Sequence, residues 1–398
     1  MLEEAGKDPA ANALIPFAGV EGVHYARLFL VEPAIDLKGR PIPAQLVFMA
    51  DFDAPAQPRL ERLVARSAAG WTRLLACCEG FTSSGGTDAG ACLAFVRRQA
   101  GGDAAYYVNT VGLGAAQAVA EARLRDAIED RLDAQPDLLK ASPAGVRDKI
   151  RDWIQSSDEL SWAISPPAPP SLGWRLGELA HLVLVALGAL VLLPLAIVLL
   201  PFWLLALRLH ERSDPAPDVL PDPHHAATLA ALEDHGPVNQ FTAIGFLKPG
   251  PFRAFTARLI LFLIAYGVRH VFNRANLAGV KTIHFARWTF IDGGRRVIFA
   301  SNYDGSVESY MDDFIDKVGW GLNAVFSNGL GYPPTQWLLW GGAHHELAFK
   351  HYLRVHQVPT QVWYAAYPSL SALNIANNAA IRLGVSGSTE AGRWLQRL

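Results

Sequence analysis

The sequence predicts an α+β protein: two ferredoxin-like units that form an α+β barrel, with a central hydrophobic helical segment inserted in a membrane. Three observations carry this prediction: a strand-rich pattern that occurs twice, alternation within each copy, and one long apolar run between the copies. We expect the first unit at 1–155, Pro-rich linkers and the membrane segment at 156–226, and the second unit at 227–398.

The internal repeat consists of three matching blocks in the same order. Each copy begins with His, an aromatic residue, Ala and Arg, continues with a second strand that ends in an acid, and closes with a longer block that begins at a tyrosine. The blocks are VHYARLFLVE (23–32) and IHFARWTFID (283–292), LVFMADFDA (46–54) and VIFASNYDG (297–305), and 107–125 and 364–382. This agreement indicates a duplication.

The second copy also has a strand at 238–248 and a helix at about 252–276 before its hairpin, which gives the order β-α-β-β-α-β. This is the ferredoxin-like arrangement, and two such units commonly face each other around a cavity. The first copy has too few residues before His24 for the leading strand and helix. We therefore expect its half of the barrel to be incomplete, or completed by a later strand of the same chain.

The membrane segment runs from Leu182 to Leu207 and carries no charged residue. It is longer than the roughly 20 apolar residues that cross a bilayer as a helix. Pro194 and Pro201 favour a kink or break, and Pro-rich stretches at 165–170 and 213–225 flank the segment. Two copies that share a cavity must lie on one side of the bilayer. We therefore expect a monotopic or re-entrant insertion and not a single crossing. The apolar run 259–268 would lie beside it in the interface or would cover a sheet.

Composition excludes several classes of protein. The chain has 35 basic and 37 acidic residues, so no overall field recruits nucleic acid. Three cysteines make neither a disulfide framework nor a zinc motif. The amino-terminal residues lack the pattern of a signal peptide, and we expect a membrane-associated protein with cytoplasmic globular parts. The oligomeric state stays open.

The second hairpin predicts a polar site. Its turn, DGGR (292–295), sets the strand register and places Arg287, Asn302 and Asp304 on one face, opposite a mostly apolar face. In the second hairpin this register pairs His284 with Tyr303, Phe285 with Asn302 and Arg287 with Ala300. Applied to the first copy, the same rule groups Arg27, Asp51 and Asp53. Polar groups on an inner face are candidates for function because burying them unpaired is costly. The alternative for Asp304 is a cap on a helix that begins at Ser306.

A segment present only in the second copy, 335–359, holds His344, His345, His351 and His356. Helical spacing places some of these imidazoles on common faces, which would permit metal ligation. The alternative is a solvated helix, since Lys350 and Arg354 lie among them.

The stretch SNYDG (301–305) resembles the Gly-x-x-Asp-Gly motif of dye-decolourising peroxidases, with Ser301 in place of the leading glycine. These proteins and chlorite dismutase belong to the dimeric α+β barrel superfamily. The resemblance implies haem b, with Asp304 as proton-transfer group, Arg287 as charge-stabilising group and Asn302 beside them. It further implies an iron ligand among His344, His345 and His351.

The function implied is a membrane-associated, haem-dependent, peroxidase-like oxidoreductase. Its apolar or lipid-soluble small-molecule substrate would enter from the lipid bilayer. Two alternatives need no cofactor. One is a membrane-bound barrel that binds a lipid or isoprenoid, or docks a partner enzyme. The other is a cofactor-free oxygenase.

Overall fold

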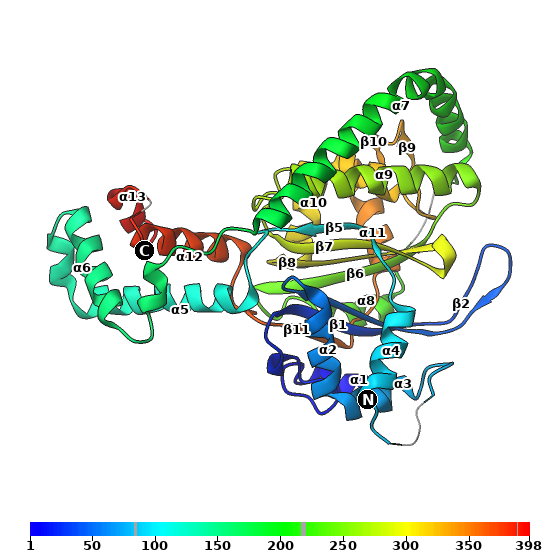
Figure 1. Ribbon diagram of the computed structural model, residues 1–398. Helices are drawn as coiled ribbons and strands as arrows, with labels where there is room; N and C mark the ends of the chain where they lie inside the picture. The colour runs from blue at the N-terminus through cyan, green and yellow to red at the C-terminus, as the bar shows by residue number, and fades with distance from the viewer. Residues whose placement is uncertain (83–85, 216–219, 388) are drawn as a thin grey trace.

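A computed structural model describes residues 1–82, 86–215, 220–387 and 389–398 of the chain. Residues 216–219, part of the second Pro-rich linker, lie outside the described residues. Two antiparallel sheets stack face to face, and helices cover the outer face of each (Figure 1). The predicted α+β class is therefore confirmed. A helical arm and a long arched helix extend from this body (Figure 1).

The three-stranded sheet has the order β11-β1-β4. Its strands are rich in β-branched and aromatic residues, and its outer face packs on short helices through a core that includes Phe17, Trp71 and Phe95. The strands are β1 (Val23–Val31), β4 (Gln45–Phe52) and β11 (Val362–Ala365); the covering helices are α1 (Leu2–Gly6), η1 (Phe17–Gly19), α2 (Ala56–Arg66), α3 (Ala68–Leu75) and α4 (Ala89–Gln99); a small ribbon is formed by β2 (Ala34–Ile35) and β3 (Pro41–Ile42).

The four-stranded sheet has the order β5-β7-β8-β6. Its outer face packs on three longer helices through a core that includes Phe241, Trp288 and Phe299. The strands are β5 (Asp103–Val108), β6 (Val238–Phe246), β7 (Ile283–Ile291) and β8 (Arg296–Asp304); the covering helices are α9 (Pro251–His270), α10 (Val307–Phe326) and α11 (Glu346–His356); shorter elements are α8 (Pro223–Ala230), η4 (Asp292–Gly294), β9 (Thr335–Gln336), β10 (Trp340–Gly341) and η5 (Gly342–His344).

Each sheet contains a strand from the other half of the chain. β5 comes from the first half and pairs with β7, where Tyr107 lies opposite Ala286. β11 comes from the second half and pairs with β1, where Tyr364 lies opposite Ala26. The two exchanged strands therefore have the same register on the two hairpins. The sheets are interleaved in sequence, and 1–155 and 227–398 each contribute to both.

The second hairpin has most of the predicted register. Phe285 lies opposite Asn302 and Arg287 opposite Ala300, as the DGGR turn predicts. The pairing of His284 with Tyr303 is wrong, because an irregularity between Ile283 and Phe285 places Ile283 opposite Tyr303. The first hairpin has the same shift between Val23 and Tyr25. An extra residue in one strand redirects its side chain, and in both hairpins that residue is the histidine.

A helical arm projects from one end of the sheets (Figure 1). Its small core includes Ile128, Ile150, Ile381 and Trp394, so helices from both halves of the chain stabilise each other. The arm consists of α5 (Ala115–Ala134), η2 (Pro136–Lys140), α6 (Pro143–Ser156), η3 (Ser161–Ile164), α12 (Ala372–Val385) and α13 (Ala391–Leu395).

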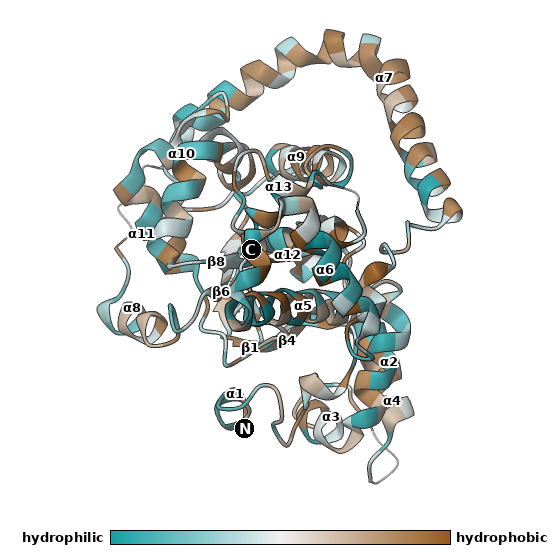
Figure 2. Cartoon of the chain, turned by 90° about the vertical axis from the view of Figure 1, so that its left-hand side faces the viewer, coloured by the Kyte–Doolittle hydropathy of each residue, from teal (hydrophilic) through white to brown (hydrophobic). Residues whose placement is uncertain are grey.

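The predicted membrane segment lies within α7 (Leu172–Ser213), which contains Pro194 and Pro201. The helix bends into an arch over α9 (Figure 1), as expected where proline removes a backbone hydrogen bond. Most of the arch is apolar along its length (Figure 2), and its residues from 182 to 200 are almost all exposed. α7 and α9 are the two described helices that are long and apolar enough to cross a membrane.

Candidate functional site

The predicted polar residues of the two hairpins meet between the sheets. Arg27 extends from β1 to the opposite sheet, where it donates to the carbonyl oxygen of Ser301 at 3.0 Å and to Asn302 Oδ1 at 2.5 Å. Arg287 extends the opposite way from β7 and donates to the carbonyl oxygen of Ala50 at 3.1 Å and to the carboxylate of Asp51. The two arginines thus make matching contacts in opposite directions.

Asp51 and Asn302 connect these contacts at the centre. Asn302 Nδ2 donates to Asp51 Oδ2 at 3.0 Å. The exchanged strands add one donor each: Tyr106 Oη donates to Asp51 Oδ1 at 3.0 Å, and Trp363 Nε1 donates to Asn302 Oδ1 at 3.2 Å. We call Arg27, Asp51, Tyr106, Arg287, Asn302 and Trp363 the central cluster.

The charged groups of the central cluster are largely buried and are paired with one another and with backbone oxygens. Burial lowers the pKa of Arg27 to about 10. Burial also lowers the pKa of Arg287, but the charge and hydrogen bond of Asp51, together with Tyr106 and Asp103, raise that pKa above its ordinary value. Arg27 makes three further bonds, to the carbonyl oxygen of Phe241 at 2.9 Å, to Thr242 Oγ1 at 2.8 Å and to Gln240 Oε1 at 3.3 Å. Buried charges with such complete pairing stabilise one arrangement of the two sheets.

Asp304 lies outside the central cluster. Its Oδ1 is 2.6 Å from His284 Nε2, and its Oδ2 accepts from the backbone nitrogen of Ala372, the first residue of α12, at 2.8 Å. The interpretation of Asp304 as the cap of the helix after it is wrong. Ser306 caps that helix through its own hydroxyl, which accepts from Ser309 N. Asp304 instead binds the amino-terminal end of a helix that is distant in sequence, a favourable place for an anion.

Asp53 makes the equivalent contacts in the first hairpin. Its Oδ1 is 2.8 Å from His24 Nε2 and accepts from the backbone nitrogen of Ala115, the first residue of α5, at 3.1 Å. Burial raises the pKa of Asp53, but His24, the backbone nitrogen of Ala115 and the charge of Arg59 together hold that pKa below its ordinary value. His24 Nδ1 also contacts Tyr367 Oη at 2.6 Å.

The predicted haem ligands lie on the other side of the four-stranded sheet. His344 and His345 are exposed and precede α11, and His351 is half-buried on α11, which covers the outer face. His344 packs against Gly319 of α10. Arg287 and Asn302, in contrast, point to the inner face. The side chains predicted to surround the two faces of one haem are thus separated by the sheet itself. Among the described residues, no group of three or more His, Cys, Asp or Glu could hold a metal ion.

The residues of this chain therefore do not fit a haem between the sheets. Direct hydrogen bonds already join Arg27 and Arg287 to the opposite sheet, and they close the space that a macrocycle would need. Asp304 and Arg287, which would act together on a peroxide, have separate partners in His284 and Asp51.

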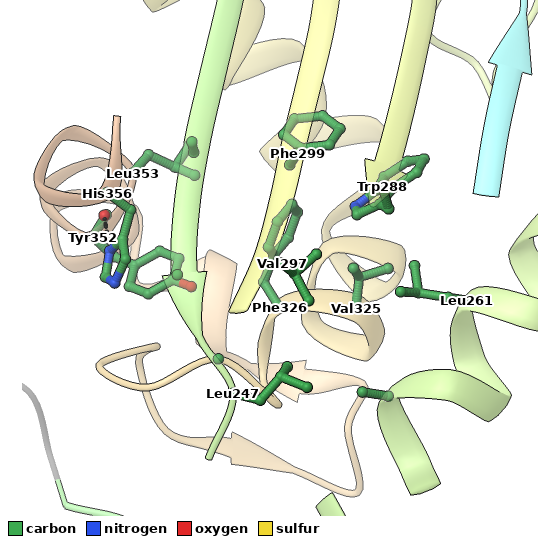
Figure 3. Close-up of a pocket in the computed structure, with 14 residues that line it drawn as sticks. Leu247, Leu261, Trp288, Val297, Phe299, Val325, Phe326, Tyr352, Leu353 and His356 are labelled. Atoms are coloured by element: carbon green, nitrogen blue, oxygen red, sulfur yellow. Dashed lines mark hydrogen bonds between the residues drawn. The ribbon is translucent and has the colours of Figure 1, made fainter. Parts of the chain in front are cut away.

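A cavity of about 40 Å³ lies on the outer face of the four-stranded sheet, under α9, α10 and α11 (Figure 3). Its walls are mostly apolar and include Leu261 of α9 and Phe326 of α10. Three polar side chains also line it: Trp288, Tyr352 and His356. Sequence reasoning missed this cavity. The one available signal was Gly245, a glycine within a strand, which can indicate the close approach of another group.

α7 exposes many large apolar side chains, most of them between Leu182 and Phe202. Both ends of the arch attach to α9. At one foot His181 Nδ1 is 2.7 Å from His270 Nε2 and Tyr266 Oη donates to the carbonyl oxygen of Leu182. At the other foot, Trp203 Nε1 donates to Thr256 Oγ1 at 3.3 Å.

α9 has apolar residues on two opposite faces. One face packs on the sheet through Leu261 and Val268, and the opposite face exposes Phe255, Leu259, Phe262 and Leu263 under the arch. The β9–β10 hairpin adds two exposed tryptophans: Trp337 at its tip, which lies against Arg208 of α7, and Trp340 at the start of β10.

Glu211 fixes this hairpin tip to α7. Its buried carboxylate accepts from the backbone nitrogens of Trp337 and Leu338, both at 2.9 Å, from Thr335 Oγ1 at 3.1 Å and from Arg208 at 2.9 Å. Trp337 and Leu338 have positive φ angles of 57° and 60°, which non-glycine residues adopt only at an energetic cost. The charged acceptor offsets that cost.

Comparison of this chain with protein families, with curated proteins and with solved structures finds no match.

Proposed function

We propose that this chain is a membrane-bound protein that lies in one leaflet of a bilayer through α7 and α9, and that it takes a small apolar molecule from that bilayer without a haem. The observation that carries the proposal is the attachment of both feet of the α7 arch to one side of the body, at the two ends of α9. An exposed apolar helix this long in water would be an aggregation liability.

The dimensions of the arch support insertion into one leaflet. From Leu182 to Pro194 a helix rises about 18 Å along its axis, close to half of a hydrocarbon core of about 30 Å. The exposed apolar face of α9 would lie at the interface below it, as amphipathic surface helices do. Trp337 and Trp340 are residues typical of that depth. Both halves of the chain would then stay on the same side.

We further propose that the two hairpins derive from a duplicated ferredoxin-like unit whose last strands have been exchanged. The equal registers of β5 and β11 support this. The side-chain contacts support it as well: those of Arg27 match those of Arg287, and those of Asp53 match those of Asp304. In this interpretation the central cluster joins the two copies, and no catalytic step is assigned to Arg287, Asn302 or Asp304.

The test is the topology of the reconstituted protein. One variant keeps only the exposed Cys77 of the first half, with Cys78→Ser and Cys92→Ser. The other replaces all three cysteines by Ser and carries Gln396→Cys in the second half. In sealed liposomes a membrane-impermeant maleimide should label both thiols to the same extent. Labelling of one and protection of the other would show a single crossing and overturn the proposal.

A further inference from the structure

The cavity under α9 contains a hydrogen-bond donor without a partner. Trp288 is 6% exposed, and its Nε1 is buried and has no hydrogen-bond partner among the described residues. Figure 3 shows the indole nitrogen on the edge of the ring that faces the cavity. A buried donor left unpaired costs about 1–3 kcal/mol, so this position favours a bound acceptor.

Two further polar atoms lie near the same hollow, on the side of α11. A methyl group built on Gly245 would be 3.6 Å from Tyr352 Oη and 3.7 Å from His356 Nε2, so both atoms approach the bare backbone of β6. His356 Nδ1 donates a hydrogen bond to the carbonyl oxygen of Tyr352 at 2.8 Å, since a carbonyl oxygen can only accept. His356 Nε2 is therefore the acceptor of this ring.

The polar groups of the cavity select a neutral ligand. Within the described parts of the chain, no Asp, Glu, Lys or Arg lines it. Burial lowers the pKa of His356, which disfavours its cationic form. A carboxylate or an ammonium group would enter without a counter-ion, at high cost. A hydroxyl or carbonyl oxygen could instead accept from Trp288 Nε1, and a hydroxyl could also donate to His356 Nε2.

The size and position of the cavity define the rest of the ligand. At about 40 Å³ it exceeds the space of one water molecule but is far below the roughly 300 Å³ of a compact ligand site. It suits the end of a slim chain. Leu261 and Ala257 form its wall on α9, whose opposite face carries the exposed apolar residues. The remainder of the chain would pass along α9 towards the arch.

We propose that this cavity binds the polar end of a neutral, single-chain lipid with a hydroxyl or carbonyl head, supplied by the bilayer. Trp288 donates to the head oxygen, Tyr352 and His356 complete its hydrogen bonds, and Gly245 leaves the space. This inference rests on the proposed membrane-bound function, for which it names the ligand class.

The experiment uses the full chain in phosphatidylcholine nanodiscs with tritiated decan-1-ol as the probe, and empty nanodiscs as the baseline. We expect one saturable decan-1-ol per chain above that baseline. Gly245→Val, whose branched side chain suits a strand but fills the hollow, should abolish saturable binding. Trp288→Phe removes one hydrogen bond and should weaken it about two- to tenfold. Ile244→Val, on the inner face of the same strand, is the matched control and should bind as the parent does.

Decanoate at pH 8 tests the preference for a neutral head, and it should bind at least tenfold more weakly than decan-1-ol. Equal retention of decan-1-ol by the parent, Gly245→Val and Trp288→Phe proteins would overturn the proposal, because a cavity that holds only water predicts that result. Equal affinity for decanoate would overturn it as well. Flotation of the same proteins with liposomes separates the two hypotheses: a protein that floats but retains no decan-1-ol contradicts the ligand site alone, and one that does not float contradicts the membrane-bound function.

Discussion

Asn302 donates a hydrogen bond to Asp51 across the interface of the two sheets, and in the repeat these residues occupy equivalent positions of the two hairpins. Two aspartates at these positions could form a hydrogen bond with each other only by sharing a proton, because an ionised carboxylate has no donor. With an amide at one position and a carboxylate at the other, the pair forms a neutral-to-charged hydrogen bond. One carboxylate then remains between two buried guanidinium groups.

Asp51→Asn should therefore destabilise the protein by about 3 kcal/mol, because the only carboxylate of the central cluster would be lost and buried charge left uncompensated. Urea unfolding followed by near-ultraviolet circular dichroism measures this. Asp103→Asn is the matched control: Asp103 also contacts Arg287, at 3.7 Å, but is more exposed, and its loss should cost about 1 kcal/mol or less. Equal effects of the two variants would mean that the cluster does not stabilise the sheet interface.

Asp53 predicts a loss of stability in acid. Its pKa in the folded protein lies below the ordinary value, so the carboxylate stabilises the fold above its unfolded pKa of about 3.9, and this contribution is lost as pH falls through the folded pKa. The difference in unfolding free energy between the parent and Asp53→Asn should shrink as the pH falls below about 4. Asp126→Asn, at an exposed position, should show no such trend.

Charges on the arch should weaken membrane binding. Leu192 is 59% exposed near the middle of α7, and an arginine in a hydrocarbon core costs about 3 kcal/mol. Leu192→Arg should lower the partition coefficient into liposomes by roughly a hundredfold. A sedimentation assay measures the bound fraction from which that coefficient is calculated. Ile35→Arg, at a 70% exposed apolar residue of β2 away from the arch, should bind as the parent does. A similar loss from both would argue for general insolubility over insertion.

Glu211→Gln should loosen the tip of the β9–β10 hairpin. The amide retains only one acceptor oxygen and turns a donor towards the backbone nitrogens of Trp337 and Leu338. Hydrogen bonds to a charged acceptor contribute about 1.5–3 kcal/mol, so exchange of these two amides with deuterium should quicken about 10- to 100-fold. Glu178→Gln, which affects the ion pair with Arg269 at the other foot, should leave both amides unchanged. Unchanged exchange in Glu211→Gln would show that the hairpin holds its own shape.

Local patterns were sufficient for part of this structure. The DGGR turn predicts the register of Phe285 with Asn302, and alternation places Arg287 and Asn302 on the inner face, because both depend only on residues close in sequence. The irregularity at His284 could not be foreseen, since an extra residue in a strand leaves no mark in an alternating pattern that already contains a polar residue.

The partners of the candidate site depend on contacts between distant segments. Nothing near Arg287 in the sequence indicates that its partner is Asp51, and nothing near Asp304 indicates α12, more than 60 residues away. The exchange of β5 and β11 has the same origin, because a strand of given composition can pair with either hairpin. His344 and His345 do not lie on a common helix with His351, because α11 begins at Glu346, directly after His345.

The exchange of the last strands has a consequence for synthesis of the chain. His24 contacts Tyr367, 343 residues further on, and β1 lacks one neighbour until β11 has left the ribosome. The edge of β1 that pairs with β11 therefore stays unpaired through nearly the whole of translation. Unpaired strand edges of this kind are prone to aggregate. A chain released before β11 would be unable to complete either the sheet or its arm, so premature termination anywhere upstream should yield material fit only for degradation.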